Sequence, residues 1–369
     1  MVNLVEVEQT VSTTNPLVSI IINNFNYATF LTAAIDSALQ QTYPHLEVIV
    51  VDDGSTDRSP EIIASYGQRV IPLIKTNGGQ ASCFNAGFAI AQGEIIFFLD
   101  SDDRLLPDIV AEVVSTFQSQ DEAVKVQYYL QVVDAKDQPQ PEFHPPLDYS
   151  FPEDLPTHIL NFYNYTWPPT SGNAFRAAAL RSVLPMPIAA HQIAADAYLN
   201  LVIALHGAVI PLRRVGGWYR VHGQNGFYAK KQELNLPHIH QLLRITADIQ
   251  TKQRELFRQK YHLPVHKIGR WDIGTLKHKL ILLKLDPSPG AISESRLNLG
   301  FQGCVATLCS DIGWRSQLIH LVWFSTTPFL PQILARFLTQ WLLYPDYRRQ
   351  RMNQLFIPFR FWAKPQARS

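Results

Sequence analysis

The feature that most restricts the fold of this chain is a repeated alternation of short apolar runs and helical segments. Four runs rich in β-branched and aromatic residues have the composition of strands buried on both faces: residues 17–22 (LVSIII), 47–51 (EVIVV), 70–74 and 95–99 (IIFFL). Segments with apolar residues at helical spacing lie between these runs and after the last one, at 31–39, 60–66, 81–91 and 107–117. Such alternation, roughly every 20 to 30 residues, forms βαβ units. It therefore predicts an α/β fold with a mixed, mainly parallel sheet flanked by helices.

Three polar clusters follow predicted strands. They lie at residues 23–26 (NNFN), 52–55 (DDGS) and 100–103 (DSDD). Ligands of open parallel sheets bind beyond the carboxyl ends of the strands. We therefore expect a ligand site at the edge that these clusters share.

The rest of the chain divides into a strand-containing part and a helical part. We predict a strand at 125–134, a loop at 138–152, an aromatic loop at 165–175, a helix at 193–206, a strand and turn at 216–225, and helices at 237–261 and 271–285. These patterns predict a first domain over 1–228, with halves at 17–110 and 111–228, and a helical region over 229–369.

The net charge of +1 conceals an uneven distribution. Residues 313–369 contain eight basic residues and one acid, a formal charge of +7, which leaves −6 on the remainder. Apolar residues within this tail share one helical stripe: Leu330, Ile333, Leu334, Phe337, Leu338, Trp341 and Leu342. Followed by Arg348, Arg349 and Arg351, the stripe suits either an anionic membrane surface or docking on the protein itself, the commoner fate. Nucleic-acid binding is disfavoured, because no known motif accompanies these basic residues.

Several other protein classes are disfavoured. The cysteines Cys83, Cys304 and Cys309 form no CxxC pair, so neither a zinc site nor a disulfide framework is indicated. The first 15 residues contain two acids and no apolar run, unlike a signal peptide. The sequence contains no uninterrupted apolar stretch of about 18 residues, so no membrane-spanning helix is predicted. We expect a cytoplasmic protein, with peripheral contact to the inner face of the plasma membrane as one option for the tail.

Asp100 and Asp102 form a D-x-D pair directly after an apolar run. Mg²⁺ and Mn²⁺ prefer oxygen ligands and often take only one or two carboxylates together with substrate phosphates. The alternative is a helix start in which acids cap free N–H groups.

Residues 17–110 resemble the nucleotide-sugar half of a family 2 glycosyltransferase. Three segments carry the resemblance: LVSIIINNFNY, QQTYPHLEVIVVDDGSTDRS and NGGQASCFNAGFAIAQGEIIFFLDSDD. It continues more weakly to about residue 225, through SGNAFR and YRVHGQN, and does not extend beyond residue 230. The resemblance implies the GT-A fold, a Rossmann-like sheet, here with a mostly helical C-terminal extension.

The resemblance also implies roles for residues near the donor. Asp53 matches the acid that contacts a uracil-type base, with Asp52 as its structural neighbour and Phe25 as an aromatic beside the base. Asn24 lies where the family often has a small hydroxyl residue. Further matches are Asp100 at the ribose, Asp102 at a Mg²⁺ or Mn²⁺ ion, and Gly78, Gly79, Asn85 and Gly87 near the ribose and sugar. His222 matches a histidine near the diphosphate or its metal, although a lone histidine is more often structural.

On the acceptor side, the resemblance assigns Trp167, Ser171, Gly172 and Asn173. The general base of the family corresponds to Asp196, where Ala195 replaces half of the usual Glu-Asp pair. Asp196 could alternatively be a helix N-terminal acid favoured by the helix dipole.

The expected function is inverting transfer of a sugar from a nucleoside diphosphate donor, preferably a uridine one, to a hydroxyl of a glycan or lipid-linked acceptor. Bacterial cell-surface or exopolysaccharide synthesis uses such reactions. Two alternatives remain: a non-catalytic nucleotide-sugar-binding scaffold and, less favoured, a D-x-D phosphatase with an aspartyl nucleophile. A nicotinamide enzyme is disfavoured because no GxGxxG follows the first strand.

Overall fold

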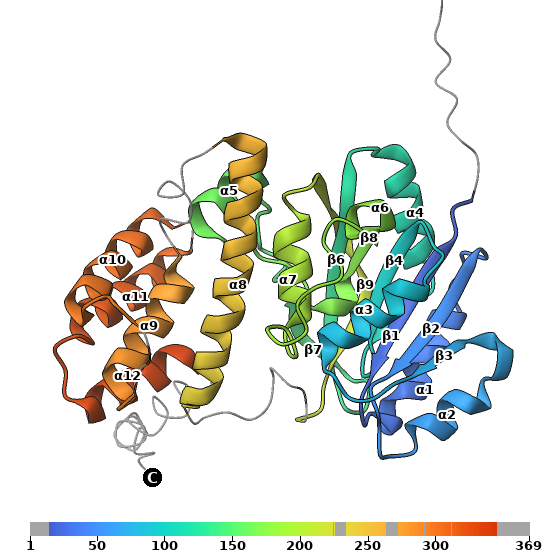
Figure 1. The fold of residues 1–369 in the computed structure, drawn as a ribbon, viewed down its shortest axis with the longest axis horizontal. Helices are drawn as coiled ribbons and strands as arrows, with labels where there is room; N and C mark the ends of the chain where they lie inside the picture. Colours follow the sequence, from blue (N-terminus) through green and yellow to red (C-terminus); the bar gives the residue numbers. More distant parts are fainter. Residues whose placement is uncertain are drawn as a thin grey trace, which may run out of the picture. The chain divides into compact units, whose positions relative to one another are not determined.

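The computed structural model of the chain describes residues 15–223, 225, 234–262, 272–288, 290, 292–310 and 312–344. The chain forms two compact units (Figure 1). One comprises Met1–Glu153 and Thr166–His222, and the other comprises Asp154–Tyr165 and Gly223–Ser369. In the described part of the chain, no helix is long and apolar enough to cross a membrane.

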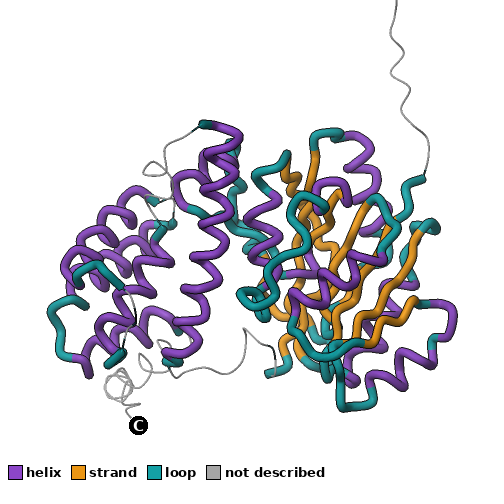
Figure 2. Tube along the Cα trace, in the orientation of Figure 1, coloured by secondary structure: helices purple, strands orange, loops and turns teal. Residues whose placement is uncertain are grey.

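The first unit is built on a nine-stranded sheet (Figure 2). Its strands are β1 (Val18–Asn24), β2 (Leu46–Asp52), β3 (Ile71–Ile74), β4 (Ile95–Asp100), β5 (Arg104–Leu105), β6 (Ala123–Asp134), β7 (Pro139–His144), β8 (Asn173–Arg176) and β9 (Ala208–Val221). Their order is β3-β2-β1-β4-β8-β6-β9-β5, and β7 pairs with β6. Strands β3, β2, β1 and β4 are mutually parallel, whereas β8 runs antiparallel to both β4 and β6. The mixed, mainly parallel α/β fold predicted from the sequence is therefore confirmed.

Helices flank this sheet. In the first unit they are α1 (Ala28–Leu39), α2 (Ser59–Ser65), α3 (Gln80–Ile90), α4 (Ile109–Ser119), α6 (Ala177–Leu180) and α7 (Ala195–Ile203), with 3₁₀ turns η1 (Gly67–Arg69) and η2 (Thr170–Gly172). The second unit contains α5 (Leu155–Phe162), α8 (Leu236–Tyr261), α9 (Ile273–Leu285), α10 (Arg296–Cys309), α11 (Trp314–Thr326) and α12 (Gln332–Leu343). The C-terminal region is helical, as expected.

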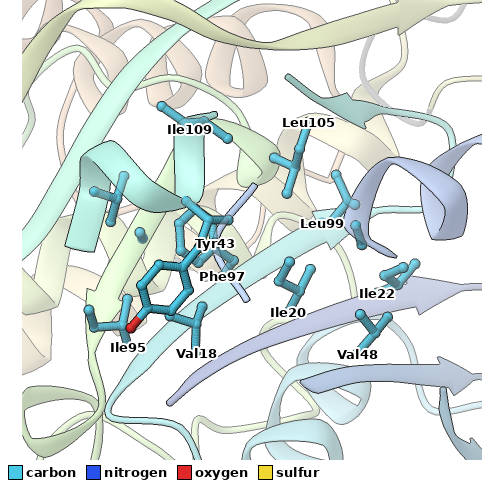
Figure 3. Packing of buried hydrophobic residues seen from close by; sticks show 14 of the residues in the cluster. Val18, Ile20, Ile22, Tyr43, Val48, Ile95, Phe97, Leu99, Leu105 and Ile109 are labelled. Atoms are coloured by element: carbon cyan, nitrogen blue, oxygen red, sulfur yellow. The ribbon is translucent and has the colours of Figure 1, made fainter. Parts of the chain in front are cut away.

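Strand β1 is buried on both faces, as its unbroken apolar composition requires. Val18, Ile20 and Ile22 pack in one cluster with residues of β4 and with α4 (Figure 3). On the opposite face, Ile21 lies so close to α3 that a Cβ on Gly87 would approach the Ile21 Cγ2 atom to 2.4 Å. Each fully buried side chain of this size contributes roughly 1.5–3 kcal/mol. The double-sided core fixes the strand ends from which the polar clusters extend.

The register of β1 aligns two of the polar clusters with it. Asn24 pairs with Asp52 of β2, and Asn23 pairs with Asp100 of β4. The adjacent carboxyl ends that were predicted from the sequence therefore lie side by side.

Several local predictions were wrong. Strand β7 forms within the stretch 138–152, which was predicted as a loop, because Pro139–His144 pairs with the neighbouring β6. Helix α5 was not predicted, and β8 begins inside the segment 165–175. Strand β9 begins at Ala208, well before the predicted residue 216. Backbone pairing between distant segments, which local composition does not report, decides each of these cases.

The apolar stripe of the tail is divided between two environments. Leu338 and Leu342 of α12 pack in the core of the second unit, as a self-docked helix would. Ile333 and Leu334 instead remain exposed. Arg348, Arg349 and Arg351 lie outside the described residues.

Candidate active site

The end of β1 ties two acidic clusters together. The Asn23 side chain donates to Asp100 Oδ1 over 2.8 Å, and the Asn24 side chain donates to Asp52 Oδ1 over 2.7 Å. The Oδ1 atoms of both asparagines are buried and make no hydrogen bond in the structure. Unsatisfied buried acceptors are unusual in native proteins and are available to a ligand donor.

Asp52 organises the turn that follows β2. Its fully buried carboxylate accepts hydrogen bonds from the Ser55 amide, over 3.0 Å, and from the Ser55 hydroxyl, over 2.6 Å. This pattern is an Asx turn, in which the side chain replaces a backbone acceptor. The contacts agree with a structural position for Asp52 beside Asp53.

Asp53 holds the segment between β3 and α3. Its carboxylate accepts from the Gly78 amide over 3.0 Å and the Gly79 amide over 2.7 Å, and it pairs with the Lys75 ammonium group. Since a carboxylate offers about four lone-pair sites, these contacts occupy most of its capacity. About one lone-pair site of the carboxylate remains for a further donor.

Gly79 allows this segment to approach the chain near α7. Its φ is +82°, and a Cβ atom there would lie 2.6 Å from the carbonyl oxygen of Gln192. The next residue, Gln80, donates its amide to the same oxygen over 2.9 Å. The Gln80 side chain also accepts from the Ala195 amide over 3.0 Å and donates to Asp100 over 3.3 Å. Gln80 thus links the start of α7 to the acids after β4.

Asn85 has a different setting from that of the glycines. Its amide donates to the Met186 carbonyl and accepts from the Met186 amide, each over 2.9 Å. The reciprocal pair uses the side chain to fasten α3 to the segment before α7.

Asp100 at the end of β4, together with Asp102 and Asp103, forms one electrostatic cluster, here called the acids after β4. Burial and the charge of Asp102 raise the pKa of Asp100 to about 7, although the hydrogen bond from Asn23 lowers it. Burial also raises the pKa of Asp103, whose carboxylate accepts from the Ser171 hydroxyl and the Arg220 amide. Such crowding favours a proton or a cation near the cluster.

Asp102 faces His222 at the end of β9. The Asp102 Oδ2 and His222 Nε2 atoms are 3.0 Å apart, and the imidazole is buried. The rings of Tyr27 and Phe30 pack on this imidazole, with centroid separations of 5.4 and 4.6 Å. Arg220 donates to the Asp102 backbone carbonyl over 2.8 Å. The aromatic contacts and the arginine fix the orientation of the Asp102–His222 pair.

This pair fits a divalent cation that binds together with a substrate diphosphate. Among the described residues no group of three or more His, Cys, Asp or Glu side chains could hold a metal by itself. Mg²⁺ is usually bound through only one or two carboxylates plus phosphate oxygens, and Mn²⁺ also accepts imidazole. A carboxylate and an imidazole nitrogen 3.0 Å apart supply the protein's part of such a site.

Asp196 lies in the first turn of α7, at the position predicted for the base. Burial raises its pKa to about 6, while the Ala197 amide, which donates to Asp196 Oδ1 over 2.9 Å, and the Lys125 charge lower it. The charge of Asp196 in turn raises the pKa of Asp100. Asp196 therefore belongs to the same electrostatic site as the acids after β4.

The predicted acceptor segment shapes one wall of this site. Asn173 donates to the carbonyls of Pro168 and Pro169, and Gly172 is packed so closely that a Cβ would lie 2.5 Å from Pro168. These contacts hold Ser171, which donates its hydroxyl to Asp103 over 2.6 Å. Trp167 precedes this turn and is half-buried.

The sequence interpretation missed three residues that contact the site and one whose charge acts on it. They are Tyr27, Phe30, Gln80 and Lys125. Phe25, the predicted aromatic, is 44% exposed. Of these four, Lys125 could have been found from the sequence. Its neighbours within residues 123–126 are all apolar, and a charged residue inside a buried strand is rare.

Known proteins resemble the chain over the part that carries the acidic clusters of this site. Residues 19–182 match the model of "Glycosyl transferase family 2". An uncharacterized glycosyltransferase of Nostoc sp. is 38% identical over 215 residues, which cover 56% of this chain and 66% of that protein. The chondroitin synthase of Pasteurella multocida is 47% identical over 105 residues, which cover 28% of this chain and 11% of that protein.

These alignments leave part of every such relative unmatched, since they span 66% or less of its length. Among solved structures, S. aureus TarS 1-349 in complex with UDP covers 91% of both chains, with 18% identity and a TM-score of 0.48. The family match contains the acidic clusters at the ends of β1, β2 and β4, whereas β9, Asp196 and His222 lie outside the matched residues. Through residues 19–182 the chain belongs to the glycosyl transferase family 2.

Proposed function

We propose that the protein is an inverting, metal-dependent hexosyltransferase that uses a nucleoside diphosphate sugar, preferably a uridine one. The observation that carries this proposal is the link between the start of α7 and Asp100. The Gln80 side chain accepts from the Ala195 amide and donates to Asp100, and the charge of Asp196 raises the pKa of Asp100. The residues proposed as the base and as the cation-binding pair would thus share one site, beside the strand edge that the resemblance assigns to the nucleotide sugar.

The donor would lie along the ends of β1, β2 and β4. Asp53 and Phe25 would meet the uracil base, and Asp100 would accept a ribose hydroxyl. The unsatisfied Oδ1 atoms of Asn23 and Asn24 support this placement, because nucleoside hydroxyls and the uracil N–H are donors. The Gly78–Gly79 segment would border the ribose and sugar.

Asp102 and His222 would hold the cation, Mg²⁺ or Mn²⁺. When bound, the cation supplies Lewis-acid stabilisation of charge on the departing diphosphate. Tyr27 and Phe30 keep the imidazole oriented, and Arg220 secures the Asp102 backbone.

Asp196 would act as the general base. Its carboxylate takes the proton of the acceptor hydroxyl while the hydroxyl oxygen bonds to the anomeric carbon. The bond from that carbon to the diphosphate oxygen breaks in the same step, and the electron pair leaves with the nucleoside diphosphate. A single displacement inverts the anomeric configuration. With a pKa of about 6, Asp196 is mostly ionised at pH 7, as a base must be.

The acceptor would be a glycan or a lipid-linked hydroxyl that approaches along the segment containing Trp167, Gly172 and Asn173. Their close packing supports a firm wall rather than a flexible one. The hypothesis places the enzyme in the cytoplasm, in bacterial cell-surface or exopolysaccharide synthesis.

A non-catalytic nucleotide-sugar scaffold is the second candidate. Ala195 favours it, because the family commonly has a Glu-Asp pair there and the alanine supplies no acidic partner. A scaffold would bind donor and cation without releasing nucleoside diphosphate.

A panel of nucleoside diphosphate sugars with Mn²⁺, scored by released nucleoside diphosphate, tests the proposal. We expect turnover with a uridine donor, a loss of roughly 10²–10⁴-fold in Asp196→Asn, and a comparable loss in Asp102→Ala. Asp108→Asn is the matched control, since Asp108 is exposed and pairs with Arg214. Full activity in both site variants would refute the assignment, and donor binding without turnover in the wild-type protein would favour the scaffold.

A further inference from the structure

Three helices of the second unit expose large apolar side chains. Exposed fractions reach 83% for Ile333, 75% for Phe329, 70% for Phe301 and 69% for Trp314. We name the following set the apolar surface: Leu297, Phe301, Leu308, Trp314, Leu318, Val322, Phe329, Ile333, Leu334 and Phe337. Contiguous exposed apolar patches in proteins mark sites of interaction with proteins or membranes.

The helices that carry the apolar surface also contribute other residues to the buried core of the second unit. In α10 the exposed residues recur at i, i+4 and i+11, whereas Leu299 and Ala306 are fully buried. In α11 they recur at i, i+4 and i+8 from Trp314, whereas Phe324 is fully buried. These helices are thus apolar on two sides, although a surface helix normally needs one apolar stripe. Folding of the unit explains the inner side only.

The exposed apolar residues of α10 and α11 lie beside one another along the two helices. Gln317 at the start of α11 donates to the Ser310 carbonyl beyond the end of α10, and a Cβ on Gly300 would lie 2.7 Å from Pro328. The two helices are therefore antiparallel neighbours, with Leu308 level with the Leu318 turn. Helix α12 packs against α11 and α9 and brings a third stripe.

Positive charge accompanies this surface. The Arg315 guanidinium stacks on the Trp314 ring, 5.3 Å from its centroid, and Arg336 is exposed on α12. Between residues 296 and 344 the sequence has three arginines and one acid, Asp311. Beyond Tyr344, where the described chain ends, six further basic residues accompany a single acid.

We propose that the apolar surface docks the protein peripherally on an anionic phospholipid bilayer. Aromatic and aliphatic side chains would enter the boundary between headgroups and acyl chains, and the arginines would pair with lipid phosphates. A second copy of the chain is disfavoured as the occupant, because a two-fold contact places the same positive patch opposite itself. An anionic bilayer instead offers the opposite charge over the whole patch.

This inference goes beyond the proposed function and does not depend on it, because binding to vesicles needs neither donor nor acceptor. If both hold, the docked enzyme meets lipid-linked acceptors at the surface where they are held.

Vesicle co-sedimentation of the full chain tests the proposal. The vesicles are phosphatidylcholine alone and phosphatidylcholine with phosphatidylglycerol. We expect binding to the anionic vesicles, weakened at least roughly tenfold in the triple variant Phe301→Ser, Trp314→Ser, Ile333→Ser, which changes one side chain on each helix. The single variants Arg315→Gln and Arg336→Gln should each bind the anionic vesicles about fivefold more weakly than the wild type.

A matched control changes three exposed apolar residues of the first unit, Ile90, Leu147 and Ile188, to Ser. This control should bind vesicles as the wild type does. Thermal unfolding checks that both triple variants remain folded, which the exposure of the substituted residues favours.

Wild-type binding by the apolar-surface variant would overturn the proposal, as would equal binding to neutral and anionic vesicles. Light scattering coupled to size-exclusion chromatography tests whether the protein associates with a second copy of itself. Self-association that the triple variant abolishes, without any vesicle binding by the wild type, would assign the surface to a second copy and overturn the membrane role.

Discussion

Two opposing influences set the pKa of the Asp196 carboxyl. Burial raises it to about 6, and the Ala197 amide and the charge of Lys125 lower it. A carboxyl group with a pKa near the working pH combines ionisation with basicity, which is the best compromise for general base catalysis. The start of α7 therefore gives Asp196 properties that an exposed aspartate lacks.

The first prediction concerns the pH dependence of sugar transfer. Only the ionised carboxylate can accept a proton, so kcat/KM should fall about tenfold per pH unit below an apparent pKa of about 6. The pH profile of kcat/KM for the donor, recorded with saturating acceptor, measures this fall. Asp196→Asn should show a low rate without this acidic limb. A wild-type profile that stays flat down to pH 5 would contradict the prediction.

The second prediction concerns Lys125, which lies fully buried in β6 and donates to Gln127 over 2.9 Å. Burial lowers the pKa of the Lys125 ammonium group well below its usual range, although the charge of Asp196 raises it. The charged form of Lys125 lowers the pKa of Asp196, so Lys125→Met should move the acidic limb to higher pH. Replacement of a buried charge by an apolar side chain of similar length can leave stability unchanged. Lys125→Arg, which retains the charge, is the comparison, and an unmoved limb in Lys125→Met would show that Lys125 does not act on the base.

At the scale of elements, the segment between β3 and α3 depends on backbone geometry. Its two glycine amides donate to Asp53, and Gly79 reaches the Gln192 carbonyl in a left-handed conformation. Two elements that are distant in sequence, α3 and the segment before α7, are joined at this point. The segment that holds Asp53 and the start of α7, which we propose as the donor side and the location of the base, are thereby held together.

The third prediction follows from this contact. Gly79→Ala should destabilise the protein by about 1–3 kcal/mol, because the new Cβ meets a backbone oxygen at 2.6 Å and φ is +82°. Denaturant unfolding measures the loss, and nucleotide affinity should fall as well. Gly67→Ala is the matched control, since its φ is also positive but nothing lies within 4 Å of the Cβ position. Its cost should be about 1 kcal/mol, with affinity unchanged. Equal effects of the two variants would contradict the close contact.

At the scale of the whole molecule, acidic and basic residues are separated along the chain. Residues 313–369 carry +7 and the remainder −6. Part of the negative charge is the buried cluster after β4, where burial and mutual repulsion raise the pKa of Asp100 and Asp103. Ionisation of these acids at neutral pH lowers stability, since a carboxyl with a raised pKa is more easily protonated in the folded state.

The fourth prediction is that a cation and nucleotide together stabilise the folded protein. UDP with Mn²⁺ at about 100 times its dissociation constant should add roughly 2.7 kcal/mol, a rise of a few degrees in Tm. Chelation with EDTA, or Asp102→Ala, should remove the part that depends on the cation, while Asp108→Asn retains it. A rise in Tm that EDTA leaves intact would contradict a role for Asp102 in cation binding.

Local sequence predicted the parallel core well and the acceptor half poorly. Strands β1, β2 and β4 are continuous apolar runs, so their composition alone identifies them. Strand β7 contains Pro139 and Pro141 and exists because it pairs with β6. The motif that contains Asn85 is recognisable in the sequence, but the contact of its amide with Met186, 101 residues away, is not.

The sequence by itself determined the α/β class and the position of the acids at strand ends, because apolar periodicity and strand polarity are local properties. Only the tertiary structure decided that Asp102 meets His222, that Lys125 acts on Asp196, and that α10, α11 and α12 keep a second apolar side exposed. Each of these depends on which side chains are desolvated together. Desolvation and electrostatic coupling act through space between distant residues, so no local pattern encodes them.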